Sequence, residues 1–127
     1  MMDTRAVVTG FLNEVRSGRN PDAAGDYLAP KVLAHQLVAE SPHTLERSPA
    51  DYAAHVREFL RDYGVFELRV DELLVDGDKA YARWTQTGRD LAVRDGRPPS
   101  GALLRQIGSA CYRVADGRIV EYWIQSS

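Results

Sequence analysis

Two Asp-Gly hairpin turns, and between them a loop over residues 90–101 that also contains Asp-Gly, divide the second half of the sequence into long segments in which apolar and polar residues alternate. A period of two sends successive side chains to opposite faces of a strand, and Asp-Gly between such segments is typical of a hairpin turn. The turns are Asp76-Gly77-Asp78 and Ala115-Asp116-Gly117-Arg118. The sequence therefore predicts an antiparallel meander with strands at residues 65–75, 79–89, 102–114 and 119–125. The alternation slips at Glu72, which predicts a bulge.

Helical periodicity dominates the first half. An apolar stripe with the spacing i, i+3, i+4, i+7 predicts a helix that begins at Asp3 or Thr4 and ends at Gly18. Pro at the first helical position predicts a short second helix over residues 21–28 and a third over 49–63. The stripe of the first helix is Val8, Phe11, Leu12 and Val15.

Helices grouped before a meander imply an α+β fold in which the helices pack on one face of a curved antiparallel sheet. One further strand is expected at residues 31–39, followed by a polar loop over 40–48. With 127 residues, of which 44% are hydrophobic, we expect one domain over residues 1–127 with a core of its own.

Charge and composition exclude several classes of protein. The 16 basic and 18 acidic side chains are scattered, with a net charge of -2, which argues against a surface that tracks nucleic-acid phosphates. No apolar run could span a bilayer, and no secretory signal is predicted. The single cysteine, Cys111, excludes an internal disulfide framework and fits a reducing, cytoplasmic location.

His35 is the first candidate for chemistry. In the strand at 31–39 it shares a face with Leu33 and Leu37. If that face is concave, desolvation disfavours the charged imidazole and leaves a neutral base near pH 7. The alternative is a hydrogen-bonded core histidine.

Glu121 shares a strand face with Trp123, and we expect both to face inward. A carboxylate in an apolar cavity has a raised pKa and can act as a general acid. The alternative is an ion pair with Arg105 or Arg113 on a neighbouring strand.

Asp90 lies at a strand end, near the expected mouth of the cavity. There it could form an acid–base pair with His35. The alternative is a solvated loop acid beside Arg89.

Aromatic and amide side chains could line a site for a flat ligand, although each aromatic ring also fits plain core packing. The predicted ligand-binding residues are Tyr27, Tyr52, Phe59, Trp84, Trp123 and Gln125. The three histidines fall in different elements without ligand spacing, so no metal is expected. No glycine-rich phosphate loop or nucleophile motif suggests a cofactor.

Several stretches of the chain together resemble one family. They are SGRNPD, VLAHQ, VDELLVDGDKAYARWTQTGR, GRPPSG and YRVADGRIVEYW. In this order they resemble the SnoaL-like polyketide cyclases, within the cone-shaped α+β fold of nuclear transport factor 2. The resemblance implies a deep pocket between the helices and the concave sheet face. It also implies a homodimer formed through the open sheet face, for which Tyr112 or Tyr122 would suit.

Family members close polyketide rings by intramolecular aldol chemistry, and relatives of the fold isomerise ketosteroids or open epoxides. The resemblance thus implies a cofactor-independent acid–base enzyme, a cyclase or isomerase, acting on an apolar, oxygenated small molecule. His35 would be its base and Glu121 or Asp90 its acid.

Other functions remain open: a non-catalytic module that either binds a small molecule or serves as an accessory dimer, and an epoxide hydrolase-like enzyme. The binding module is suggested by residues 124–127, because many members carry an aspartate after the tryptophan of the final strand and none follows Trp123 here.

Overall fold

A six-stranded sheet with the strand order β2-β1-β6-β5-β4-β3 forms one layer of the protein. The structure, a computed structural model, describes residues 2–126. The strands are β1 (Leu28–Gln36), β2 (His43–Arg47), β3 (Glu67–Asp76), β4 (Lys79–Arg89), β5 (Leu103–Ala115) and β6 (Arg118–Ser126). All neighbouring strands pair antiparallel except β1 and β6, which are parallel. The predicted meander is confirmed, including its bulge, which lies between Val70 and Glu72.

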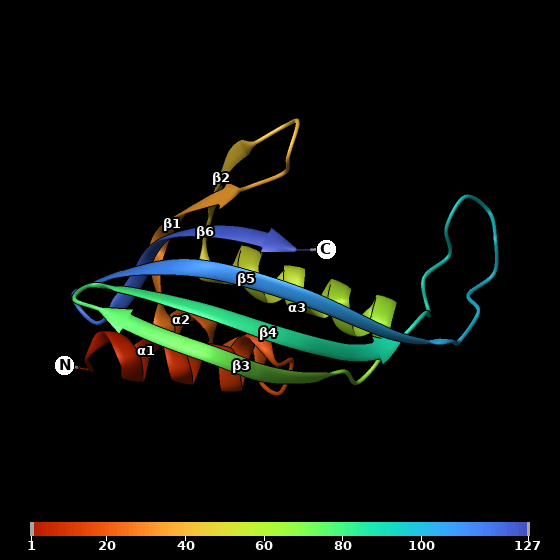
Figure 1. Cartoon of the computed structure of the whole chain (residues 1–127), viewed down its shortest axis with the longest axis horizontal. Coiled ribbons are helices and arrows are strands. Elements are labelled where there is room, and N and C mark those ends of the chain that lie inside the picture. The colour runs from red at the N-terminus through yellow and green to blue at the C-terminus, as the bar shows by residue number, and fades with distance from the viewer. Residues whose placement is uncertain (1, 127) are drawn as a thin grey trace.

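The helices form a second layer on one face of this sheet, which we call the inner face (Figure 1). The helical elements are α1 (Thr4–Gly10) with the π-helical turn η1 (Phe11–Arg16), η2 (Pro21–Ala23) with α2 (Ala24–Tyr27), and α3 (Pro49–Tyr63). The three predicted helices and the α+β class are thus confirmed. Within residues 2–126, no helix is long and apolar enough to cross a membrane.

Local capping explains where the helices begin. The Asp3 carboxylate accepts a hydrogen bond from the Ala6 N–H at 2.8 Å, which satisfies one free amide of the first turn. Ser48 and Asp51 form a reciprocal capping box at the start of α3. At the other end of α3, Gly64 has a φ of 72°, a conformation that favours glycine and ends the helix.

The core lies between the α1–η1 stripe and the inner face. Phe11 is fully buried and makes edge-on contacts with two tyrosines. The ring centroids are 5.1 Å apart for Tyr52 and 5.6 Å apart for Tyr112. Burying a side chain of this size contributes roughly 1.5–3 kcal/mol. Buried side chains that project inward from the strands include Val32, Ala34, Ala82, Trp84, Ala110, Tyr112 and Tyr122.

The first two strands differ from the prediction. β1 begins at Leu28 and contains Pro30, which is tolerated because the pairing of β1 with β6 is irregular between Leu28 and Leu33. The segment expected as a polar loop contains β2, which pairs antiparallel with β1. All residues of β2 except Arg47 are exposed, so this edge strand has no apolar alternation by which sequence could reveal it.

The face of β1 that points inward is the one with Val32 and Ala34, not the one with His35. Val32 and Ala34 face inward and are fully buried, whereas Leu33 and Leu37 are 43% and 40% exposed. The physical reason is the size of Tyr122, which is paired with Ala34 across the parallel ladder. Its ring fills the inner space beside β1, and a small side chain opposite makes room for it.

The predicted orientations of five side chains are therefore wrong. His35, Glu121 and Trp123 lie on the other side of the sheet, the outer face. Tyr112 and Tyr122, expected to be exposed at a dimer interface, are 1% and 3% exposed. Homodimer formation stays a prediction, without these two residues.

Gly108 makes room for Trp84, and its replacement tests this packing. An added Cβ would lie 2.6 Å from Trp84 Nε1, which is closer than van der Waals contact allows, so the large indole ring would have to shift. We expect Gly108→Ala to lower the free energy of unfolding in urea by about 1–3 kcal/mol.

The matched control for that substitution is Gly25→Ala. Nothing lies within 4 Å of its added Cβ, so this helical change should be neutral or stabilising by up to about 1 kcal/mol. Equal unfolding energies for wild type and Gly108→Ala would contradict the packing described.

Candidate functional site

A cavity of about 470 Å³ lies on the inner face, between α3 and the strands. It begins where the α1–η1 stripe ends, at Arg16. Helix α3 contributes His55, Phe59 and Tyr63 to its wall. The rest of its lining is Gln36, Leu37, Val38, Ala39, Trp84, Gln86, Gln106, Ile107, Gly108, Ile124 and Gln125. A concave, partly aromatic space of this size is typical of small-molecule sites.

A row of polar groups crosses the sheet side of the cavity. Gln86 Nε2 lies 3.5 Å from Gln106 Oε1, and Gln106 Nε2 lies 3.5 Å from the Tyr63 hydroxyl. Both contacts are long and weak. Gln86 is buried, and its Oε1 has no hydrogen-bond partner among the described residues. Because these mutual contacts are weak, a bound ligand could replace them with hydrogen bonds of its own.

His55 presents an uncharged imidazole to the cavity near pH 7. Burial, followed by the charges of Arg47 and Arg16, lowers its pKa from 6.5 to about 4. Its ring packs edge-on against Phe59 at 4.4 Å. The Glu58 carboxylate is 3.9 Å from Nδ1, too far for a hydrogen bond. A neutral imidazole can accept a proton from a bound molecule.

Arg16 brings a buried positive charge to the same space. Arg16 is only 7% exposed. Its guanidinium carbon lies 4.5 Å from the centroid of the Phe59 ring and 5.4 Å from that of Trp84. Nη1 has no hydrogen-bond partner among the described residues. The described lining includes neither Asp nor Glu, so no carboxylate of the cavity wall balances this charge.

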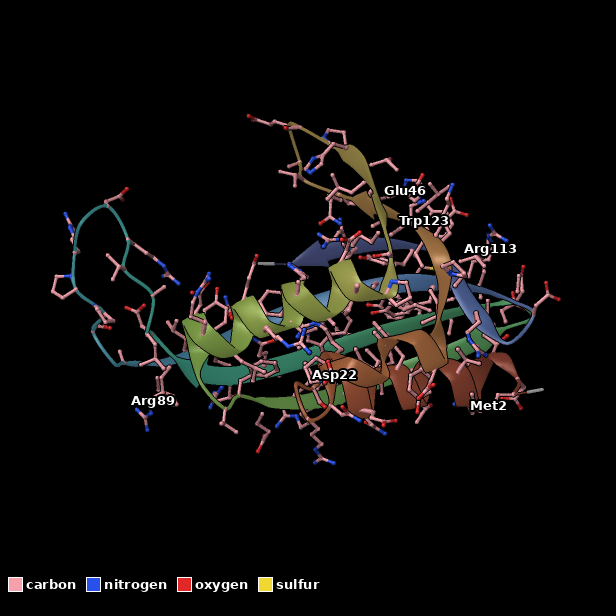
Figure 2. The ribbon with its side chains drawn as sticks, turned by 180° about the vertical axis from the view of Figure 1, so that it is seen from behind. Met2, Asp22, Glu46, Arg89, Arg113 and Trp123 are labelled. Atoms are coloured by element: carbon pink, nitrogen blue, oxygen red, sulfur yellow. The ribbon has the colours of Figure 1, made fainter. Side chains whose placement is uncertain are left out.

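The predicted catalytic residues His35 and Glu121 do meet, but on the outer face. His35 Nε2 lies 2.6 Å from Glu121 Oε2, and Arg113 Nε donates to Glu121 Oε1 at 2.9 Å. The Trp123 ring stacks on His35 at 5.1 Å. Figure 2 shows Arg113 and Trp123 at the same end of the sheet, far from Arg89.

This geometry distinguishes the two roles predicted for Glu121, a general acid or a partner in an ion pair. The hydrogen bond with His35 has the largest effect on the Glu121 carboxyl and lowers its pKa; burial opposes it, and the contacts with Arg113 add to the lowering, so the net pKa lies below its usual value. The predicted raised pKa is therefore wrong, and the alternative, an ion pair with Arg113, is confirmed.

Asp90 braces the loop between β4 and β5. Its carboxylate accepts a hydrogen bond from Ser100 Oγ at 2.7 Å, which lowers its pKa. Its backbone bonds to Ala102 and Gly101 close the base of the loop, which projects from one end of the sheet (Figure 1). Strands β5 and β6 separate β4 from β1, so the predicted pairing of Asp90 with His35 is wrong.

Three of the six predicted ligand-binding residues line the cavity: Phe59, Trp84 and Gln125. Their binding role stays a prediction. The Tyr27 hydroxyl donates to Glu14 at 2.5 Å, and Tyr52 is buried in the core. Neither lines the cavity, and Trp123 lies on the outer face.

Sequence reasoning missed Arg16 and His55, although a signal for both exists. Arg16 follows Leu12 by four residues, so it occupies the apolar stripe of the first helix. His55 follows Tyr52 by three residues and precedes Phe59 by four, so it lies on the buried stripe of the third. A polar residue at an apolar position of a helix is a sequence signal for a site in the interior.

Comparisons with known proteins agree with this architecture. The family model described as SnoaL-like polyketide cyclase matches residues 6–126. No curated protein matches the sequence. Among solved structures, similar ones include a candidate polyketide cyclase from Acidithiobacillus ferrooxidans, with 23% identity, 98% of this chain and 87% of that chain covered, and a TM-score of 0.81.

Two further structures are similar over almost the whole chain. IdmH, a candidate polyketide cyclase from Streptomyces antibioticus, has 22% identity, covers 99% of this chain and 93% of its own, and has a TM-score of 0.81. A SnoaL-like polyketide cyclase from Agrobacterium tumefaciens has 13% identity, with 100% and 93% covered and a TM-score of 0.76. At these identities the structures show the shared fold.

The lowered pKa of His55 makes a prediction about stability. A base whose pKa falls from 6.5 to about 4 on folding binds fewer protons in the folded state between these values. The free energy of unfolding should therefore fall as the pH drops from 6.5 to 4. We expect His55 to account for about 2 kcal/mol of that fall, discounted because 32% of its side chain is exposed.

Urea unfolding of wild type and His55→Gln at pH 7.0 and 4.5 measures this contribution, because the variant keeps the carboxylate titrations and loses that of His55. Between pH 7.0 and 4.5, the free energy of unfolding should fall more for wild type than for His55→Gln. Parallel losses would contradict a buried neutral imidazole.

Glu121→Gln tests the structural role of the outer-face cluster. The variant loses the charged partner of Arg113 and His35, so we expect its unfolding free energy at pH 7 to be about 1–2 kcal/mol lower. Because the Glu121 pKa is lowered on folding, this stabilisation is present above the usual pKa of a glutamate and is lost as the pH falls through the lowered pKa of the folded protein. Glu46→Gln, at an exposed position, is the control. No stability difference at pH 7 would contradict this role.

Proposed function

Because the chain belongs to the SnoaL-like polyketide cyclase family, we propose that it is a cofactor-independent acid–base enzyme whose site is the inner-face cavity. The substrate would be an apolar small molecule that carries ketone groups. The observation that supports this most is a neutral imidazole, His55, in a partly aromatic cavity that also holds weakly bonded amide and phenol groups.

In the proposed reaction, His55 accepts a proton from the carbon next to a substrate carbonyl. The electron pair of the broken C–H bond moves onto the carbonyl oxygen and forms an enolate. The amide groups of Gln86 and Gln106 and the Tyr63 hydroxyl are the donors available to that oxygen.

Two outcomes follow from the same enolate. Attack of its carbon on a second carbonyl of the same molecule forms a C–C bond and closes a ring, and the new alkoxide takes the proton back from His55. Return of the proton to a different carbon gives an isomer instead. Neither outcome consumes an oxidant or a cofactor.

A non-catalytic binding protein is the second candidate. It is favoured by one observation: the described lining of the cavity contains no carboxylate, so the proton transfers would depend on His55 and Tyr63. Such a protein would hold a ligand in the same cavity and leave its C–H bonds intact.

Exchange of α-protons for deuterium distinguishes the two candidates. The probe is 2-tetralone, a flat bicyclic ketone, followed by proton NMR in D₂O with wild type, His55→Gln and His35→Gln. We expect exchange above the buffer rate with wild type, about 100-fold slower with His55→Gln, and unchanged with His35→Gln.

The remaining outcomes assign the function differently. Loss of exchange in His35→Gln alone would move the chemistry to the outer face and contradict the proposal. Binding of 2-tetralone, seen as Trp84 quenching, without any exchange would leave the binding protein as the function.

A further inference from the structure

Arg16 is a charged side chain placed where a helix stripe is otherwise apolar. It follows Val15, which is fully buried, and is itself 93% buried, given its exposed fraction of 7%. It occupies the last position of η1, where the partial negative charge of a helix end favours a cation. Even so, Nη1 has no hydrogen-bond acceptor within the part of the chain that the structure describes.

Burial of a guanidinium is costly unless an acceptor or an anion replaces the water it loses. The rings of Phe59, Phe66 and Trp84 offset part of this cost, since they lie 4.5, 5.9 and 5.4 Å from the guanidinium carbon. Aromatic faces attract the cation but accept no strong hydrogen bond. The Nη1 donor therefore remains unsatisfied among the described residues, in a side chain that lines the cavity.

The charge of the cavity wall indicates which group that is. Arg16 is the one residue of the described lining with a permanent charge, and the lining includes no Asp or Glu. The imidazole of His55 is neutral, and the nearby Glu58 carboxylate, which is not part of the lining, lies 3.9 Å from its Nδ1, beyond hydrogen-bonding distance. The cavity is thus electropositive, and the planar fork of arginine pairs best with the two oxygens of a carboxylate.

We propose that Arg16 forms a carboxylate-binding subsite and that the natural ligand is a flat, apolar carboxylic acid. The carboxylate would pair with the guanidinium, and the ligand's rings would pack beside Phe59 and Trp84. This inference rests on the proposed function for its choice of cavity and adds the substrate class. It gives Arg16 a role in binding, separate from the proton transfer assigned to His55.

The experiment compares two probes of equal shape. They are 2-naphthoate, a carboxylate, and naphthalene-2-carboxamide, its neutral amide, and their dissociation constants are measured by calorimetry at pH 7. Wild type should bind the acid at least about tenfold more tightly than the amide. Arg16→Met keeps the apolar stem of the side chain and should reduce this ratio to about one.

Arg19→Met is the matched control, because Arg19 is exposed and outside the cavity, and it should keep the wild-type ratio. If Arg16→Met does not fold, Arg16→Lys replaces it and should give an intermediate ratio, since lysine keeps the charge and loses the fork. A ratio near one in wild type, an unchanged ratio without the arginine, or no binding of either probe would each overturn the subsite.

The result is separable from the test of catalysis, because 2-tetralone carries no charge. Exchange of 2-tetralone protons without preference for naphthoate would leave the enzyme and remove the subsite. Preference for naphthoate without exchange would retain the subsite in a binding protein.

Discussion

Packing of the α1–η1 stripe against the sheet fixes which side chain of every strand faces inward. Phe11 contacts Tyr52 of α3 and Tyr112 of β5, so one ring ties both helices to the strands. Because strand side chains alternate, placing Tyr112 inside also places Gly108 and Gln106 inside. The cavity is the part of the inner face beyond the end of this stripe.

Charged side chains have partners on the outer face of the sheet and lack them on the inner face, among the described residues. On the outer face, Glu121 has two partners, Arg113 and His35, at hydrogen-bonding distance, and the cluster is saturated. On the inner face, Arg16 and His55 have no carboxylate of residues 2–126 at that distance. Saturated polar clusters stabilise a structure, whereas unpartnered polar groups of a cavity wall remain available to a ligand.

Local chemistry made most of the fold predictable. Asp-Gly turns, helix caps and the helical stripe each act within a few residues, so sequence located the helices and the meander. The face of β1 was not predictable in this way, because Leu33 and Val32 are both apolar. The choice depends on Tyr122, about ninety residues away in sequence and adjacent in space. The error carried His35 and Glu121 to the wrong side of the sheet.

The central claim, that the inner face holds the ligand site, can be tested directly because each face carries one of the two tryptophans. Trp84 lines the cavity, and Trp123 stacks on His35 outside it. The measurement is an NMR titration of the two indole N–H resonances with 2-naphthoate. We predict a saturable shift of the Trp84 resonance with Trp123 unchanged. A shift of Trp123 alone would contradict the account.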